Sequence, residues 1–141
     1  LEYKIKSEYF FPLFADKLFC DLTPKSLKFL NKIKQIKRFR KNVRLFSEGD
    51  NPCCIYILRK GKAQILFNDK LNAVKISRSI NCDEILGLTE AVINLPYETE
   101  TRTITSCILE CIGRDEFVKF LHSDPDVCFR LLRLSCLNLQ K

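Results

Sequence analysis

The sequence predicts an α+β fold: an antiparallel β-roll, a double-stranded β-helix of the jelly-roll kind, flanked by N-terminal helices and by two C-terminal helices. Three observations lead to this prediction. Apolar residues recur at helical spacing near both ends of the chain. Short segments between them alternate with a period of two, and turns rich in Gly, Asn and Asp separate these segments. With 141 residues, we expect a single domain over residues 1–141.

The chain opens with one or two short helices, expected over about residues 10–32. Thr23 suits the N-cap position and Pro24 the first helical position. Leu27 and Leu30 then recur at helical spacing. These helices are short, so they need a partner surface.

The β-roll is expected over about residues 34–113, with a helical insert at about 88–94. The segment "CCIYILRKGKAQILF" predicts two strands joined at Gly61, a residue that is free to take positive φ. Ile55 and Ile57 alternate as expected for a half-buried strand.

Two helices, at about 114–122 and 125–140, are expected to close the chain. Asp124 is a candidate N-cap and Pro125 suits the next position. The apolar surface of the last helix is wider than one face needs, so we expect a homodimer seam there. The alternative is a helix packed more deeply into its own core. The residues expected at the seam are Val127, Leu131, Leu134, Ser135 and Leu137.

The net charge of +7 is concentrated near the N-terminus, where residues 1–44 hold 12 Lys/Arg and 4 Asp/Glu. Seven basic residues and no acid lie between Lys32 and Arg44. Such a run fits nucleic acid, an anionic membrane or a solvated strand face. We favour the solvated face, because no aromatic stacking pattern or DNA-reading helix accompanies it. We therefore expect no membrane partner and no nucleic-acid binding by this segment alone.

The eight cysteines lack the paired C-x-x-C spacing of a zinc or thioredoxin-type site. No secretion signal is visible, so we expect reduced thiols, a cytoplasmic location and no metal site. Cys53 with Cys54, and Cys107 with Cys111, are the pairs to consider for redox or iron–sulfur chemistry. The single histidine, His122, has no plausible catalytic partner, so we expect no enzymatic activity.

The chain has the order helix, roll, helices, and it contains the segments "SEGD" and "IYILRKGKAQI" and an insert before "PYETETRT". In these features it resembles the cyclic nucleotide-binding domain of Crp/Fnr-type transcription regulators. The resemblance covers about residues 12–140. It implies that Gly49 and Gly61 form turns of the roll. It also implies that the last helix is a dimer interface, and that a DNA-binding or other effector domain lies outside this chain.

The resemblance places a ligand site in the insert, whose family pattern is Gly-Glu-Leu-Ala, a short helix, then Pro-Arg-Ala-Ala-Thr. In the family the Glu binds the ribose hydroxyl and the Arg pairs with the cyclic phosphate. Here "DEIL" stands at the start, with Asp83 for the Gly, and Tyr97 stands at the Arg position. The candidate pocket is Glu84, Ile85, Leu86, Gly87, Leu88, Tyr97, Glu98, Thr99 and Arg102.

A buried phosphate without a paired cation carries a desolvation cost of several kcal/mol, and a bidentate Arg is its usual partner. Tyr97 offers only a neutral donor, and Glu98 adds negative charge. Strand alternation is expected to put Arg102 on the face of Glu98 and Glu100.

We therefore expect a regulatory sensor and dimerisation module without a cofactor that does not bind ordinary cAMP or cGMP. The alternatives are a genuine cyclic nucleotide receptor, a cysteine-based redox or metal sensor, and an insert that merely plugs the roll. In the last case, Leu86, Leu88, Ala91, Val92, Ile93 and Leu95 fill the interior.

Overall fold

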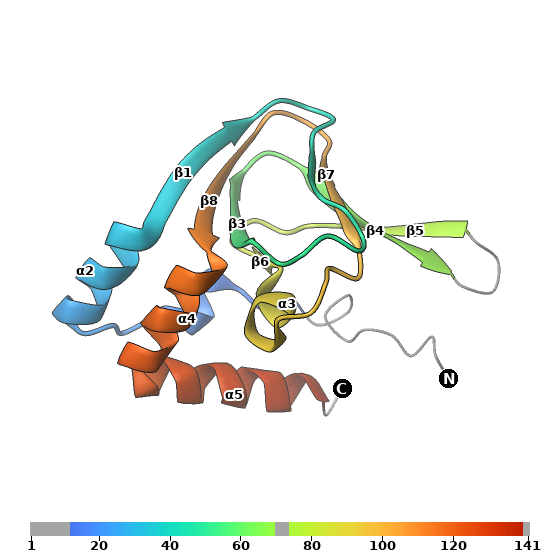
Figure 1. Cartoon of the computed structure of the whole chain (residues 1–141). Helices are drawn as coiled ribbons and strands as arrows, with labels where there is room; N and C mark the ends of the chain where they lie inside the picture. The colour runs from blue at the N-terminus through green and yellow to red at the C-terminus, as the bar shows by residue number, and fades with distance from the viewer. Residues whose placement is uncertain (1–11, 70–73, 140–141) are drawn as a thin grey trace.

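The computed structural model describes residues 12–69 and 74–139 (Figure 1). The helices are α1 (Ala15–Leu18), α2 (Pro24–Ile33), α3 (Leu88–Ile93), α4 (Arg114–Ser123) and α5 (Pro125–Leu139). The strands are β1 (Lys34–Phe39), β2 (Arg44–Phe46), β3 (Cys54–Lys60), β4 (Ala63–Asp69), β5 (Val74–Ser79), β6 (Ile85–Leu86), β7 (Glu100–Thr103) and β8 (Cys107–Gly113). The predicted α+β fold with a central β-roll is confirmed.

Two four-stranded antiparallel sheets form the roll. One has the strand order β1-β8-β3-β6 and the other β2-β7-β4-β5. In Figure 1 helices α2, α4 and α5 lie at one end of the roll, and the β4–β5 hairpin projects from its side. The insert that contains α3 runs between the two sheets, from β6 to β7.

Strand β3 is buried on both of its faces, rather than half-buried as its alternating pattern suggested. Tyr56 and Leu58 point into the roll, whereas Ile55 and Ile57 belong to a second core beneath the helices. The helices cover the outer face of β3, so every position along its centre is apolar or aromatic.

The buried side chains therefore form two clusters. The roll interior consists of Phe46, Tyr56, Leu58, Ala63, Ile65, Ile80, Leu86, Tyr97, Cys107, Leu109 and Cys111. The helical core consists of Ala15, Leu18, Leu30, Ile55, Ile57, Ile85, Leu88, Ala91, Ile112, Phe117, Phe120, Leu121 and Val127. The short strand β6 joins the two clusters, because Leu86 faces one and Ile85 faces the other.

Both predicted helix caps are confirmed. The Thr23 hydroxyl accepts a hydrogen bond from the Ser26 amide at 3.1 Å. The Asp124 carboxylate accepts one from the Val127 amide at 3.1 Å and another from the Ser26 hydroxyl at 2.5 Å. Through this second bond, the cap of α5 also ties α5 to α2, which lies about a hundred residues earlier in the chain.

The seam predicted on α5 requires correction. Val127 is 1% exposed, and Leu131 and Leu134 pack against the helical core of their own domain. These three residues recur at helical spacing, so they define the inward face of α5. Ser135 and Leu137 are exposed, but Ser135 bonds back to the Leu131 carbonyl at 2.9 Å.

The β3–β4 turn depends on a glycine. Gly61 has φ of +103°, and a side chain there would place its first carbon 2.4 Å from the Ser106 carbonyl oxygen and 2.8 Å from the Cys107 sulfur. Only glycine allows the two turns to pack this closely. None of the described helices combines the length and the apolar composition that a bilayer crossing needs.

Replacing Asp124 by Ala is expected to lower the free energy of unfolding by about 1–2 kcal/mol, because both the Val127 amide and the Ser26 hydroxyl lose their acceptor. Urea unfolding at neutral pH measures this loss. The matched control is Asp126→Ala, which removes an exposed carboxylate from the same helix turn and should cost less.

The stability difference between wild type and Asp124→Ala should depend on pH. Burial alone raises the pKa of Asp124, but the bonds from Ser26, Val127 and Asp126 and the charge of Arg130 hold it below its usual value. The carboxylate therefore contributes fully above the unfolded pKa of about 4, and its contribution is lost as pH falls through the folded pKa. The gap between wild type and Asp124→Ala should shrink on acidification. A stability difference that does not change with pH would contradict an ionised Asp124 in the folded state.

Candidate functional site

The candidate site is the insert between β6 and β7, which leaves the sheet at Leu86 and returns at Glu100. Gly87 precedes α3 with φ of +80°, and Asn94 ends the helix with φ of +58°. The guanidinium of Arg114, at the start of α4, donates to the Ala91 carbonyl at 2.8 Å. A cation thus satisfies one of the carbonyls in the last turn of this short helix.

Tyr97 closes the insert from inside the roll. Its side chain is 2% exposed, and its ring stacks on Phe46 with centroids 3.9 Å apart and planes at 15°. Its hydroxyl donates to the Cys54 carbonyl at 2.8 Å and accepts from the Cys54 amide at 3.4 Å. Tyr97 therefore links the end of the insert to the first residue of β3.

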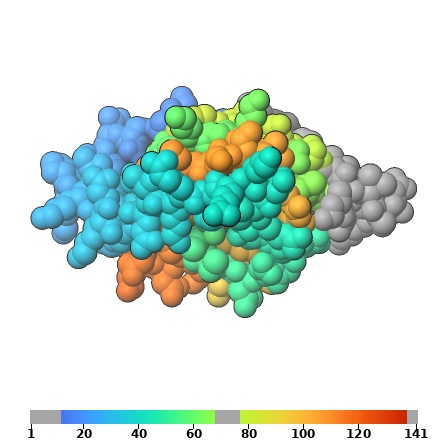
Figure 2. All heavy atoms as spheres, turned by 90° about the horizontal axis from the view of Figure 1, so that it is seen from above, coloured from blue at the N-terminus to red at the C-terminus, as the bar shows by residue number. Residues whose placement is uncertain are grey.

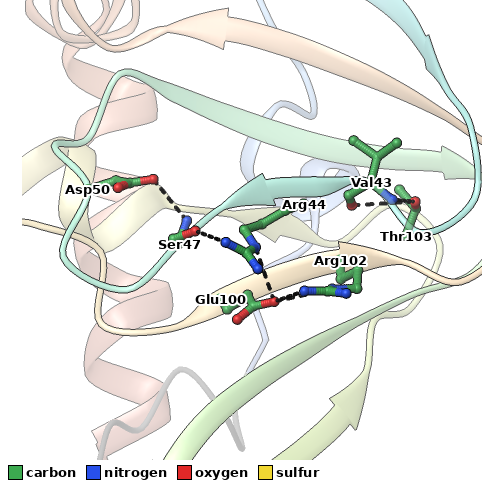
Figure 3. A network of polar contacts seen from close by, with 7 residues as sticks. All are labelled: Val43, Arg44, Ser47, Asp50, Glu100, Arg102 and Thr103. Carbon is green, nitrogen blue, oxygen red and sulfur yellow. Dashed lines mark hydrogen bonds and ion pairs between the residues drawn. The ribbon is translucent and has the colours of Figure 1, made fainter.

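The main chain of Tyr97 is held just as firmly. Its amide donates to the Asp50 carbonyl at 2.9 Å, and its carbonyl accepts from the Gly49 amide at 2.8 Å. The turn "SEGD" therefore pairs with the insert, a contact between segments about fifty residues apart. The same turn is closed by the Asp50 carboxylate, which accepts from the Ser47 amide at 3.0 Å (Figure 3).

The space beside Gly87 is occupied by Tyr97. A side chain on Gly87 would lie 3.1 Å from the Tyr97 ring and 3.2 Å from the Cys54 carbonyl oxygen. Burial raises the pKa of the Tyr97 phenol, although its bond to Cys54 opposes the shift. At physiological pH Tyr97, which stands at the arginine position of the pattern, is therefore neutral.

Glu84 is used within the fold. Its side chain is 2% exposed and binds Arg78 on β5, with Nη1–Oε1 of 3.1 Å and Nη2–Oε2 of 2.6 Å. It also accepts from the Asn81 amide at 3.0 Å. A paired and buried carboxylate of this kind fixes the turn before β6. The sequence pattern suggested a ribose ligand, but the structure gives Glu84 a protein partner.

The geometry also changes how the insert matches the family pattern. The pattern puts Gly directly before the acid and the short helix, and in the structure Gly87 directly precedes α3. Leu88, and not Glu84, then stands at the position of the acid. Leu88 is 5% exposed and belongs to the helical core, so it offers nothing to a ribose hydroxyl.

Asp83 adopts the left-handed backbone that glycine favours, with φ of +69°. Aspartate tolerates this region better than most residues. Its carboxylate forms an ion pair with Arg59, and Arg59 also binds Glu110 at 2.9 Å. The negative charge of Asp83 is therefore paired with Arg59 of β3.

The idea that apolar side chains of the insert plug the roll is only partly right. Leu86 lies in the roll interior, but Leu88 and Ala91 lie in the helical core. Val92, Ile93 and Leu95 are 44%, 53% and 55% exposed. Tyr97 and Leu86 are the two side chains of this segment that fill the roll interior.

Arg102 lies outside the roll, in the network of Figure 3. Its Nη2 is 2.7 Å from Glu100 Oε2, and Arg44 Nε approaches the same oxygen at 3.4 Å. Arg44 and Arg102 are direct partners across β2 and β7, so Glu100 offsets two facing cations. The expectation that Arg102 shares a face with Glu100 is confirmed. Glu98 is exposed and Thr99 is buried.

Sequence reasoning missed three participants: Phe46, the main chain of Cys54, and Thr101. Thr101 is fully buried, and its hydroxyl has no hydrogen-bond partner among the described residues. Its register neighbours, Phe46 and Ile65, both face the roll interior. The alternation "TETRT" could have indicated an inward row of threonines.

The cysteine pairs do not form an evident reactive centre. All eight thiols are free. Burial is the main cause that raises the pKa of Cys54 and Cys107, and it raises the pKa of Cys111 to about 11. Protonated thiols are poor nucleophiles and poor metal ligands. The described residues contain no group of three or more metal-ligating side chains arranged to hold an ion.

Comparisons with known proteins agree with this architecture. A family profile described as "cyclic nucleotide-binding domain" matches residues 36–124. A comparison of the sequence with curated proteins finds no match.

Three solved structures illustrate the likeness. The catabolite activator protein of Thermus thermophilus superposes with a TM-score of 0.77 at 17% identity, over 88% of this chain and 58% of its own. The sensor domain of the transcriptional regulator DNR from Pseudomonas aeruginosa gives 0.75 at 17%, over 89% and 82%. The N-terminal domain of a transcriptional regulator from Streptomyces coelicolor A3(2) gives 0.72 at 20%, over 89% and 88%. These identities establish the fold alone.

Replacing Tyr97 by Phe is expected to lower the free energy of unfolding by about 1–2 kcal/mol, because the partly buried Cys54 carbonyl loses its donor while the stacking on Phe46 is kept. Denaturant unfolding measures the loss. The matched control is Tyr56→Phe, since no bond from that hydroxyl to the main chain is found among the described residues. Equal stability of Tyr97→Phe and wild type would show that the hydroxyl bridge contributes nothing.

Proposed function

This chain belongs to the cyclic nucleotide-binding domain family, and from that premise we propose that it is a regulatory sensor and dimerisation module of the Crp/Fnr type that does not take ordinary cAMP or cGMP. The observation that carries the proposal is Tyr97. A neutral, buried ring bound to Cys54 and stacked on Phe46 stands where the family pattern has an arginine.

The physical argument concerns the phosphate charge. A cyclic phosphate that entered beside Gly87 would have to displace the Tyr97 ring and break its bonds to β3. It would then be buried without a cation, because Arg102 is bound to Glu100 and Arg78 to Glu84. The uncompensated charge costs several kcal/mol, and neither Leu88 nor Glu84 is available to bind a ribose.

The wider role follows from the relatives by analogy. The chain spans 58% of the Thermus protein, so any DNA-binding or other effector domain lies beyond the matched region. The Pseudomonas neighbour is described as the sensor domain of a transcriptional regulator. We propose the same non-catalytic role here, in the cytoplasm, where free thiols are stable.

A homodimer formed by α5 is part of the proposal, with a seam different from the one first expected. Phe129 and Leu132 are 61% and 58% exposed, and the exposed Cys128, Ser135 and Cys136 recur beside them at intervals of three and four residues. This face points away from the domain's own core, so a second α5 can cover it.

One observation favours the alternative of a genuine receptor for a small ligand. The Thr101 hydroxyl is buried within the roll and has no partner among the described residues, which costs about 1–3 kcal/mol if nothing satisfies it. A ligand that entered the interior past Phe46 could form a hydrogen bond with this hydroxyl.

Titration calorimetry of the folded chain with cAMP and with cGMP tests the ligand proposal. We expect no saturable heat at millimolar nucleotide, because the phosphate has no free cation to meet. Saturable heat would overturn this part of the proposal. If heat appears, Thr101→Val shows whether the interior hydroxyl takes part, since this change keeps the shape and removes the polar group.

Sedimentation equilibrium tests the dimer. Leu132→Glu should raise the dissociation constant by at least about tenfold, or about 1.4 kcal/mol, because it places charge at the centre of the seam. The matched control is Leu27→Glu, because Leu27 is a leucine of α2 that is also exposed, at 48% against 58% for Leu132. A wild-type chain that remains monomeric at high concentration, or equal effects of both variants, would contradict the proposed seam.

A further inference from the structure

Three turns meet at the end of the roll that lies opposite α5 (Figure 1). They comprise residues 40–43, 60–62 and 103–106. The Asn42 amide donates to the Thr103 carbonyl at 2.9 Å, and the Ile104 amide donates to the Lys62 carbonyl at 2.8 Å. The Lys62 amide in turn donates to the Thr105 hydroxyl at 3.0 Å. Hydrogen bonds thus join the three turns into one surface, which Figure 2 shows from above with the three segments side by side.

This surface gathers positive charge from distant parts of the chain. Arg38 and Lys60 both lie opposite Ile108 on β8. Residues 37–43, 60–63 and 103–109 contain no Asp or Glu. The cations of these residues are all exposed, and no ion pair involving them is found among the described residues; they are Lys37, Arg38, Arg40, Lys41, Lys60 and Lys62.

Aliphatic side chains are exposed among these cations. Ile104 is 41% exposed in the turn that joins β7 to β8. Ile36 is 71% exposed and shares a face of β1 with Arg38, two residues on. It lies opposite Glu110, whose charge is paired with Lys34 and Arg59. Neither isoleucine is needed to fill the two cores, so both present apolar surface beside the charges.

We propose that this end of the roll docks on an anionic membrane surface. Lipid phosphate and carboxylate groups complement the cations, each of which contributes about a fivefold gain in binding near such a surface. Exposed isoleucines gain by entering the boundary between headgroups and acyl chains. A cluster carried by three adjoining turns at one end of a rigid roll can meet a flat surface at several points together.

A nucleic acid fits the same charges less well. The three turns carry no exposed aromatic side chain for base stacking, and no helix lies at this end of the roll to enter a groove. Ile104 and Ile36 would face a phosphate backbone that gives them no partner. The proposal replaces the solvated strand face expected from the run Lys32–Arg44, because the structure adds Lys60, Lys62 and Ile104 to that run.

Cosedimentation of the chain with lipid vesicles tests the proposal. We expect partitioning to vesicles of phosphatidylcholine with about one third phosphatidylserine, little to pure phosphatidylcholine, and a steep loss on adding salt. Lys60→Gln with Lys62→Gln should lower the partition coefficient about 25-fold. Ile104→Ser should lower it further without changing the net charge.

The controls separate a site from the general positive charge of the chain. Lys25→Gln with Lys28→Gln removes the same charge from α2, and Leu27→Ser removes an exposed aliphatic side chain there. Both should change partitioning less than about twofold. Equal losses at both places, or no preference for anionic vesicles, would overturn the proposal. Binding of a short DNA duplex in solution without any vesicle partitioning would also overturn it.

Discussion

The bridge from Tyr97 to Cys54 is the contact on which the interior of this domain depends. It joins the returning end of the insert to the first residue of β3, and the same ring covers Phe46. The main chain of Tyr97 adds two bonds to the turn at Gly49 and Asp50. Three segments far apart in the chain therefore meet at one residue. Tyr97 also fills the space beside Gly87.

Three carboxylates at or beside the insert pair with arginine side chains of the protein. Glu84 pairs with Arg78, Asp83 with Arg59, and Glu100 with two arginines across β2 and β7. A phosphate-binding site usually holds a cation that has no protein partner, because pre-organised positive charge binds the phosphate. Thr101, on β7 just after the insert, keeps a buried hydroxyl without a partner among the described residues.

The opposite ends of the molecule offer different surfaces. At the helical end, α5 uses Val127, Leu131 and Leu134 for its own core and leaves Phe129 and Leu132 outside. At the other end, three turns collect cations and Ile104. The proposed dimer and the proposed membrane contact therefore use separate surfaces, and one does not block the other.

The sequence alone determined what depends on local chemistry. Short segments specify the helix starts at Thr23 and Asp124 and the turn at Gly61, because caps and turns are local properties. The pattern around Ile55 specified a strand, but it did not show that both faces of this strand are buried. The missing cation at Tyr97 was also visible, since it needed only the family pattern.

Only the tertiary structure decided which face of α5 is buried, because its apolar residues surround more than one side and packing alone chooses among them. Tertiary structure likewise gave Glu84 a partner in Arg78, seated Tyr97 on Phe46, and brought Lys60 and Lys62 beside Arg38. These contacts join residues that lie far apart in the sequence, on strands and on the turns between them. They could not be read from the sequence because strand register and sheet order are set by the whole fold.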